Sequence, residues 1–468
     1  MPPPSSLAGS DPTGRPGLSQ RVDGASLAIF RIAFGLALAW QTLDYLLSGQ
    51  LVADYVDPSL HFPYLGFSWV QPFGELGMRV SFVAMTALSL CVAAGVLYRF
   101  ACAALFLLTA HWFLIDTVYY NNHYYLQVLV CLLLLCVPAH RTWALGSATV
   151  PDDPRHETVP MWAVWLIRFQ LAVVYVYGGL AKLDPDWLTG VPIRAIFSEH
   201  AETSLFGPFL ISKGGGLFFA WAGLFLDLAV VPGLLFRRTR PLAFALITLF
   251  HLANAYLFRI GVFPWLMIGA TTIFFEPDWP RRLWRSTKHA RPAGEEPAPR
   301  ALATFLGLYA VVQLLVPLRH HLYPNRVTWS QEGFAFAWHM MLRHKEARTE
   351  FRVHDGDGRL IPLDPQWPIS AKQWAFMGYD PFAVLHLAHW LGEEARRQGV
   401  SNPSVYAGAQ CSLNGREPQL LIDLERDLMT VRDRLAPADW VLPLESEDLP
   451  ERPYDGRLDA LAERLSQR

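Results

Sequence analysis

A lysine with the potential for base chemistry stands at the end of an apolar stretch, in Tyr175–Asp184 (YVYGGLAKLD). Lys182 follows a flexible diglycine. Burial disfavours the charged ammonium form, so a partly desolvated lysine can act as a base near neutral pH. The alternative is an ordinary interfacial anchor paired with Asp184 or Asp186. Position alone favours the anchor, and the residues at this point leave both roles open.

A second candidate site is a polar turn between two apolar stretches, Tyr119–Tyr125 (YYNNHYY). Its amides Asn121 and Asn122 and the imidazole of His123 form a cluster of hydrogen-bonding groups. An aromatic belt at the membrane surface, with a histidine reaching toward water, would also account for the tyrosines. Two adjacent amides and an imidazole exceed what such a belt requires.

Few other polar side chains lie inside apolar stretches, where each costs free energy unless it finds a partner. His251 and Asn254 are one helical turn apart and share a face, and a satisfied buried histidine is the default interpretation of His251. Asp227 needs a buried partner or protonation, and the sequence does not identify the partner. His and Glu do not recur at metal-ligand spacing, so we expect no metal. The common nucleotide-binding and serine-nucleophile motifs do not occur either.

Membrane helices must position these groups, because 52% of the 468 residues are hydrophobic and only 17% are charged. Nine stretches are apolar enough for transmembrane or deeply buried helices: 27–47, 80–98, 101–120, 124–138, 161–181, 216–236, 241–258, 260–275 and 301–318. The fourth and eighth are shorter than the roughly 20 residues of a full span, so we expect eight or nine transmembrane helices. A net charge of −2 argues against nucleic acid as a partner, and the spacing of the five cysteines argues against a disulfide framework.

The distribution of Lys and Arg between these stretches predicts the orientation, because cytoplasmic loops carry more of both. With the N-terminus inside, fourteen lie on the cytoplasmic side and five on the other. Nine spans would then place the C-terminal part outside the cytoplasm, and an even number would reverse this. We expect a disordered cytoplasmic tail over 1–25 and a helical membrane domain over 26–318.

The last part of the chain, 319–468, reads as an α+β extramembrane domain that follows a charged, proline-rich cytoplasmic linker at 281–300. Alternation in Thr349–His354 (TEFRVH) and a turn at Asp355–Gly358 (DGDG) predict a hairpin. Residues 380–399 look helical, and Gln419–Asp423 (QLLID) looks like another strand. The expected fold is thus a polytopic α-helical membrane protein with a C-terminal α+β domain.

Five stretches in this order resemble the vitamin K-dependent gamma-carboxylase family, whose membrane portion is called the HTTM domain. They are Tyr55–Val70 (YVDPSLHFPYLGFSWV), Asn121–Leu126 (NNHYYL), Ala181–Trp187 (AKLDPDW), His251–Trp279, which ends in FFEPDW, and Trp338–Val353 (WHMMLRHKEARTEFRV). The chain is shorter than the animal enzymes and is similar to the bacterial branch. The resemblance implies a bacterial inner-membrane protein with its C-terminal domain on the periplasmic side.

The resemblance also implies a γ-glutamyl carboxylase that uses vitamin K hydroquinone, whether phylloquinol or menaquinol. Such an enzyme couples oxidation of the quinol by O2, which gives the epoxide, to addition of CO2 at the γ-carbon of a glutamate in a protein or peptide. Because that γ-proton is too weakly acidic for any side-chain base, quinol oxygenation in a dry site must supply the stronger base. Two alternatives are a quinol epoxidase that carboxylates no protein and a non-enzymatic quinone or lipid binder.

Carried over residue by residue, the resemblance makes Lys182 the base that deprotonates the quinol. Asn122 and His123 would position the quinone ring and stabilise the developing anion, with Asn121 beside them. His251 would support the same pocket.

The remaining carried-over residues lie at or beyond the last apolar stretch. His320 would be a further quinol contact, although His321 adjoins it. Arg343 and Lys345 would orient the substrate carboxylate, the alternative being a solvated face. Ser404 stands where the resemblance leads us to expect a substrate-contacting arginine.

Overall fold

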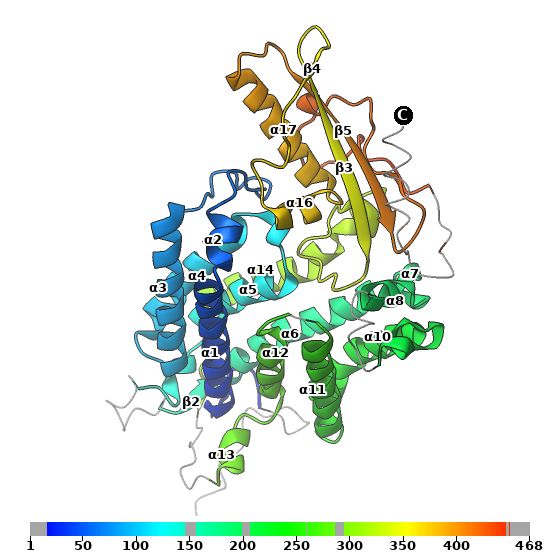
Figure 1. Ribbon diagram of the computed structural model, residues 1–468. Helices are drawn as coiled ribbons and strands as arrows, with labels where there is room; N and C mark the ends of the chain where they lie inside the picture. Colours follow the sequence, from blue (N-terminus) through cyan, green and yellow to red (C-terminus); the bar gives the residue numbers. More distant parts are fainter. Residues whose placement is uncertain are drawn as a thin grey trace, which may run out of the picture.

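The computed structural model describes residues 16–145, 156–198, 206–258, 260–285, 294–445 and 449. A bundle of helices forms one end of the molecule, and a sheet with its own helices forms the other (Figure 1). Most of the expected N-terminal tail (1–15) and the middle of the expected linker (286–293) lie outside the described residues.

All nine apolar stretches are helical in the structure. They form α1 (Ala25–Ser48), α3 (Gly74–Ala94), α4 (Tyr98–Leu114), α5 (Asn122–Cys136), α6 (Met161–Ala181), α10 (Lys213–Leu235), α11 (Arg240–Leu257), α12 (Phe263–Thr271) with η3 (Thr272–Phe274), and α14 (Arg300–Leu315) with η4 (Val316–Leu322). Shorter helices join them: α2 (Gln50–Tyr55), η1 (Thr117–Tyr119), η2 (Ala139–Arg141), α7 (Pro185–Leu188), α8 (Val191–Ser198), α9 (Gly207–Ile211), α13 (Trp279–Leu283) and α15 (Val327–Ser330).

Five of the described helices are long and apolar enough to cross a membrane: α1, α3, α6, α10, and α14 together with η4. The prediction of a helical protein with several membrane-spanning segments is confirmed for these five helices by their length and composition. Helices α4, α5 and α12 with η3 are apolar but shorter, so the expected eight or nine spans stay a prediction.

The chain before α1 is tied to the loops at the same end of the bundle. Arg21–Asp23 forms β1, which pairs antiparallel with β2 (Thr158–Pro160). The carboxylate of Asp23 accepts the N–H of Ala25 at the start of α1 and pairs with buried Arg281 at 2.8 Å. The predicted end of the disordered tail, residue 25, is therefore too late in the chain, because residues 21–23 form a strand of this small sheet.

The extramembrane part is built on a four-stranded sheet in the order β4-β3-β5-β6. Its elements are β3 (Lys345–His354), β4 (Leu360–Ile361), α16 (Ala371–Met377), α17 (Pro381–Arg397), β5 (Ser404–Leu413), β6 (Gln419–Leu420) and η5 (Leu428–Thr430). The predicted β3–β4 hairpin and the predicted helix at 380–399 are confirmed. Side chains of β5 and α17 form a separate hydrophobic core in this part.

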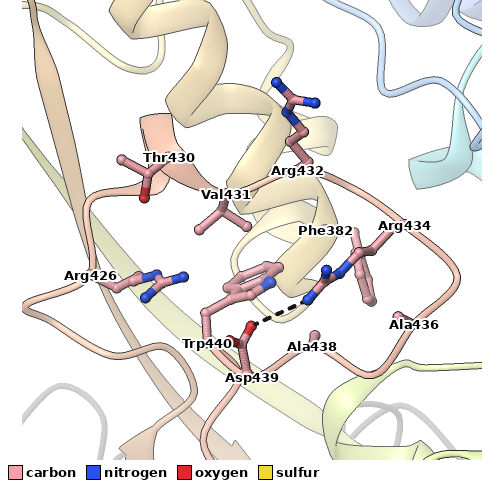
Figure 2. A pocket seen from close by; sticks show the side chains of 10 residues that line it. All are labelled: Phe382, Arg426, Thr430, Val431, Arg432, Arg434, Ala436, Ala438, Asp439 and Trp440. Carbon is pink, nitrogen blue, oxygen red and sulfur yellow. Dashed lines mark ion pairs between the residues drawn. The ribbon is translucent and has the colours of Figure 1, made fainter.

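After β6 the chain runs along α17, where Val431 packs into the same core (Figure 2). The rings of Trp440 and Phe382 meet edge to face, 5.9 Å apart. Arginines of this returning segment surround the two rings.

Helix α16 attaches the extramembrane part to the polar turn. The amide of Gln373 donates to Asp116 at 2.7 Å, and Lys372 pairs with Asp54 at 2.8 Å. The hydroxyls of Ser370 and Tyr119 lie 3.2 Å apart. The turn predicted to carry chemistry is therefore held between the bundle and the sheet.

Candidate active site

A cavity of about 350 Å³ lies where α6, α10 and α11 meet the polar turn before α5. Its wall includes five of the predicted site residues, Asn121, Asn122, His123, Lys182 and His251. Most of the remaining wall consists of aromatic and aliphatic side chains. Asn121 and His251, 130 positions apart in the chain, thus meet around one largely apolar space.

The ammonium group of Lys182 is buried at the wall of this cavity and has two acceptors. Nζ donates to Oδ2 of Asp227 at 2.6 Å and to the carbonyl of Gly178 at 3.1 Å. It also lies 5.4 Å from the ring centre of Trp187. The side chains of Lys182 and Asp227 are only 6% and 5% exposed. Each therefore pairs with the charge of the other, which would be costly to bury alone. Lys182 is the buried partner that Asp227 requires.

The diglycine before Lys182 allows α6 and α10 to pack closely. A Cβ built on Gly179 would lie 2.7 Å from Cδ2 of Leu228 on α10, too close without a shift of one helix. Gly178 and Gly179 both lie within the regular helix α6. Gly179 therefore allows close packing of α6 on α10 rather than the expected flexibility, and this packing brings Lys182 within reach of Asp227. A Cβ on Gly178 would instead lie 2.7 Å from Cε of Met340.

The polar turn is fixed by hydrogen bonds to the segment between α15 and β3. Nδ2 of Asn122 donates to the carbonyl of His339 at 2.8 Å, and the hydroxyl of Tyr120 donates to Oδ1 of Asn122 at 2.9 Å. The same hydroxyl accepts the N–H of Phe336 at 2.8 Å. The turn is therefore an organised part of the cavity wall, which an aromatic belt would not require.

Two histidines of the cavity wall each have a buried ring nitrogen without a protein partner among the described residues. Nε2 of His251 lies 3.2 Å from the hydroxyl of Tyr175, which also contacts Thr271 at 3.0 Å, so the ring is oriented. Among the described residues, Nδ1 of His251 and Nδ1 of His339 are buried without a hydrogen-bond partner. Both residues line the cavity, as does His123, whose ring stacks on Phe263 at 5.2 Å.

His320 lies behind this cavity rather than in its wall. Its ring centre is 4.8 Å from that of His339, and its Nδ1 is 2.8 Å from the carbonyl of Pro317. Burial, together with the nearby His320 and Arg343, lowers the pKa of His339 to about 3, which keeps that imidazole neutral. His320 therefore reaches the cavity only through His339.

Arg343 and Lys345 are partly buried and bonded to protein acceptors, so the solvated-face alternative is wrong for both. Arg343 lines a neighbouring cavity of about 680 Å³, stacks on the ring of Phe334 at 4.1 Å and donates to Gln331. Lys345 donates to two backbone carbonyls, one of them that of Tyr379 at 2.8 Å. Burial lowers the pKa of Lys345 to about 7. Arg343 thus belongs to the wall of that cavity, whereas Lys345 lies outside it.

Ser404 lies far from both cations. The antiparallel register of β3 and β5 places Lys345 opposite Leu413 and His354 opposite Ser404, at the two ends of the ten-residue ladder. At about 3.3 Å per residue the two ends are roughly 30 Å apart. The expectation that Ser404 replaces a substrate-contacting arginine near Arg343 is therefore wrong.

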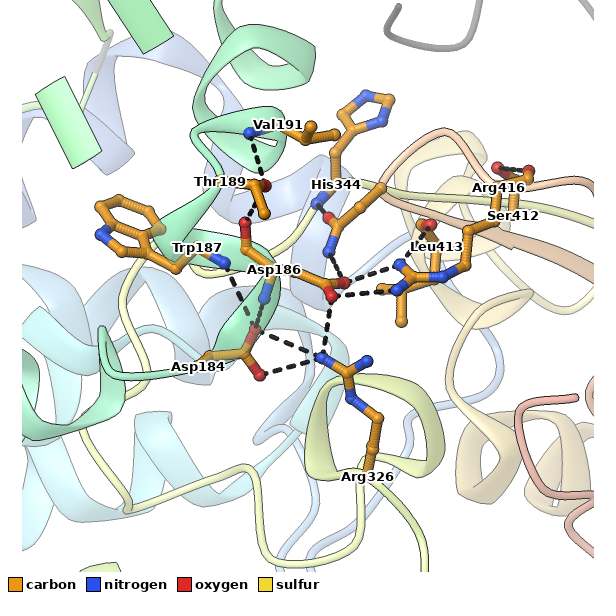
Figure 3. A network of polar contacts seen from close by, with 11 residues as sticks. Asp184, Asp186, Trp187, Thr189, Val191, Arg326, His344, Ser412, Leu413 and Arg416 are labelled. Carbon is orange, nitrogen blue, oxygen red and sulfur yellow. Dashed lines mark hydrogen bonds and ion pairs between the residues drawn. The ribbon is translucent and has the colours of Figure 1, made fainter. Parts of the chain in front are cut away.

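The two aspartates after Lys182 bind arginines of the extramembrane part (Figure 3). Arg416 meets Asp186 through two contacts of 2.6 and 2.9 Å, and Arg326 lies 3.1 Å from Asp186 and 3.3 Å from Asp184. The expected anchor pairing of Lys182 with either aspartate is wrong, because both carboxylates are already engaged. Lys182, the candidate base, pairs with Asp227 instead.

Several residues that complete the site have no role predicted from the sequence. His339 lies within the stretch WHMMLRHKEARTEFRV that carried part of the resemblance, and its position in that stretch was a usable signal. Tyr175 precedes Lys182 by seven residues, two helical turns on the same face of α6. Asp227 was the one acidic residue in its apolar stretch, which marks a functional candidate at membrane depth.

Fold and cavity together define a polytopic membrane protein whose site lies under an extramembrane domain. The HTTM domain family matches residues 19–279, and the vitamin K-dependent gamma-carboxylase lumenal domain family matches residues 298–447. The chain belongs to the vitamin K-dependent gamma-carboxylase family. No solved structure matches the chain.

Proposed function

We propose that this protein is a γ-glutamyl carboxylase that uses vitamin K hydroquinone, O2 and CO2. The observation that carries the proposal is the single cavity that joins Lys182, Asn122, His123 and His251. The overall reaction converts hydroquinone and O2 to epoxide and water and converts glutamate and CO2 to γ-carboxyglutamate. When bound, the hydroquinone supplies, through its oxidation by O2, the strong base that the γ-proton of glutamate requires.

The cavity wall fits a flat ring with an oxygen on each side. Its surface is mostly apolar, and its wall includes the amino group of Lys182 and the imidazoles of His251 and His339. A planar hydroquinone would bury its ring against aromatic side chains and direct its hydroxyls to these groups. Asn122, held by the hydroxyl of Tyr120, would keep the ring oriented.

Lys182 would first pass one proton of its ammonium group to Oδ2 of Asp227, and the amine so formed would then accept a hydroxyl proton at Nζ. The 2.6 Å contact between Nζ and Oδ2 gives a short transfer path, and the carboxylate holds the amine in one position. His123 and Asn122 would stabilise the negative charge left on the ring oxygen. The apolar wall would exclude water, which protects a strong base from quenching.

The glutamate would approach from the neighbouring cavity, which shares Tyr120 and Phe334 with the wall of the first. Arg343 lines it and would orient the glutamate carboxylate. Because Ser404 lies far from this position, its lack of charge does not argue for epoxidation alone. We further propose a domain boundary near residue 318, eight or nine spans, and a bacterial inner membrane with the C-terminal domain in the periplasm.

The test is a paired assay on the purified full chain in detergent with chemically reduced vitamin K and labelled CO2. We expect label in a glutamate-containing peptide and a matching amount of epoxide. Epoxide without label would favour the epoxidase alternative. Tight quinone binding with neither product would favour the non-enzymatic binder.

A further inference from the structure

The proposed reaction leaves one surplus proton in the cavity of Lys182 in each turnover. Hydroquinone and O2 give epoxide and water without a net proton, but a glutamate side chain that exchanges a γ-hydrogen for CO2 gains a negative charge and releases a proton. In the order of steps proposed for Lys182, the surplus proton stays on its pair with Asp227, which ends as an ammonium group and a protonated carboxyl group. The pair is buried, so the next turnover requires a route by which this proton leaves.

His339 connects the cavity of Lys182 with a third cavity of about 940 Å³, which lies between the end of α6 and η4. Among the described residues, His339 is the one residue that belongs to both walls, and it is 4% exposed. The carboxylates in the wall of the third cavity, Asp184 and Asp186, are engaged by arginines (Figure 3). The histidines of this wall are therefore its available proton acceptors near neutral pH.

Three histidines form a row that begins at the buried His339. The ring centre of His320 lies 4.8 Å from that of His339 and 4.0 Å from that of His321. His320 is half-buried and His321 is exposed, so exposure increases along the row. All three belong to the wall of the third cavity. The row thus leads from the wall of the Lys182 cavity to an exposed side chain.

The backbone contact of His320 determines which of its ring nitrogens can take up a proton. Nδ1 lies 2.8 Å from the carbonyl of Pro317, and a carbonyl oxygen only accepts, so Nδ1 carries a hydrogen. In the neutral ring Nε2 is then the unprotonated nitrogen. The same carbonyl stabilises the imidazolium that forms when Nε2 accepts a proton. His320 is therefore held ready to receive a proton at Nε2.

We propose that His339, His320 and His321 carry the surplus proton out of the Lys182 cavity. Nζ of Lys182 gives a proton to the water formed in the reaction as Asp227 returns its own proton to Nζ, and the water passes the proton to His339. Nε2 of His320 receives it next and gives it to His321 and the solvent. The inference rests on the proposed function, because carboxylation is the step that produces the surplus proton. It replaces the quinol contact that the resemblance implies for His320 with a role exerted through His339.

The test separates the first turnover from later ones, on the full chain in detergent with chemically reduced vitamin K, a glutamate peptide and CO2. The first turnover does not require the proton to leave, so the rapid-quench burst of epoxide in His320→Gln should match that of the parent. The steady-state rate should fall about tenfold or more, because positioned proton transfer contributes at least this much. Imidazole added to the buffer should restore part of the steady-state rate of the variant and leave the parent unchanged.

A binding measurement separates this role from a direct quinol contact. An anaerobic titration with reduced vitamin K, followed by tryptophan fluorescence, should give the same Kd for His320→Gln and the parent. A weaker Kd in the variant would make His320 a quinol contact and overturn the proposal. His354→Gln is the matched control, because His354 is a half-buried histidine on β3 outside the walls of these cavities, and it should change neither rate.

The remaining outcomes distinguish failure of the row from failure of the proposed function. If His320→Gln unfolds at a lower temperature than the parent, His339→Gln interrupts the same row and takes its place in the test. A parent that forms epoxide and γ-carboxyglutamate in equal amounts, with a steady-state rate that the variants share, would leave the proposed function standing and overturn the row. Epoxide without γ-carboxyglutamate would contradict the proposed function and, because no surplus proton then forms, the row with it.

Discussion

Asp186 and Arg416 form a buried, two-contact ion pair that joins the segment after the candidate base to the end of strand β5. The contacts measure 2.6 and 2.9 Å, and the two side chains are 3% and 1% exposed. Because Asp186 follows Lys182 by four residues, the extramembrane part fixes the chain beside the cavity. This pair is a positioning contact rather than part of the chemistry.

Asp186→Asn should destabilise the protein by about 3 to 5 kcal/mol, because it leaves the buried guanidinium of Arg416 without its counter-charge. The free energy of unfolding in detergent is the measurement. Glu75→Gln, which removes an exposed pair with Arg79, is the control and should change stability little. Equal losses for the two variants would mean that the Asp186 contact contributes no more than a surface pair.

The same contact predicts a dependence of stability on pH. Burial alone would raise the pKa of Asp186, but hydrogen bonds from Arg416 and Asn414 outweigh it and hold this pKa below its ordinary value. The carboxylate therefore contributes its stability above about pH 4 and loses it as the pH falls through the lowered folded value. Unfolding midpoints measured from neutral to acidic pH should fall more steeply in the parent than in Asp186→Asn. Parallel curves would contradict the assignment.

Lys182→Ala should abolish epoxide formation and also destabilise the protein by about 3 kcal/mol or more, since Asp227 would stay buried without a partner. Lys182→Ala/Asp227→Asn should recover most of the stability but none of the activity. Epoxide yield and thermal unfolding, measured on the same preparations, separate the two effects. Epoxide from the stable double variant would assign the base role to another residue.

Lys345 should make substrate binding depend on pH near neutrality. Burial lowers its pKa to about 7, and the nearby Arg343 also lowers it, whereas Asp380 acts in the opposite direction. Its positive charge near Arg343 is lost as the pH rises, so we expect KM for a glutamate peptide to increase severalfold between about pH 6 and pH 8. In Lys345→Met this step should disappear. An identical KM profile in the variant would remove Lys345 from the substrate side.

As the pH rises through the pKa of Lys345, the stability of the protein should increase while its affinity for substrate decreases. The unfolded chain keeps the Lys345 proton up to the ordinary value of 10.5, whereas the folded protein releases it near 7. The folded state therefore gains stability as the pH rises from about 7 toward 10.5. A comparison of parent and Lys345→Met unfolding over this range checks the sign.

The helices and the members of the candidate cavity could be predicted because their signals are local or carried by the family resemblance. Apolar stretches mark the helices, and polar residues inside them are few enough to stand out. The pairing of Lys182 with Asp227 could not be predicted, because it depends on how α6 and α10 pack at Gly179. No spacing rule connects residues 45 positions apart.

Strand β5 was not predicted, because the residues that it packs under α17 are small. Its buried face carries Val405, Ala407, Ala409 and Cys411, mostly small residues that fit under α17. Small side chains give a weak strand signal, because strand propensity follows β-branched and aromatic residues. Without β5 the register could not be read, and Ser404 was placed beside the wrong end of β3.

The topology prediction depends on the short helix α12. Helices α11, α12 and α14 lie between the turn at Arg238 and the loop at Ser401. If each of the three crosses the membrane, as we propose, these two residues lie on opposite sides. Helix α12 with η3 covers only Phe263–Phe274, about 18 Å at 1.5 Å per residue, and it begins at the cavity. We expect a membrane-impermeant maleimide to label Ser401→Cys in intact spheroplasts and Arg238→Cys only after lysis. Native Cys411 is buried and should react only after unfolding. Labelling of both engineered cysteines from one side would mean that α12 does not complete a crossing, and the reverse pattern would invert the whole protein.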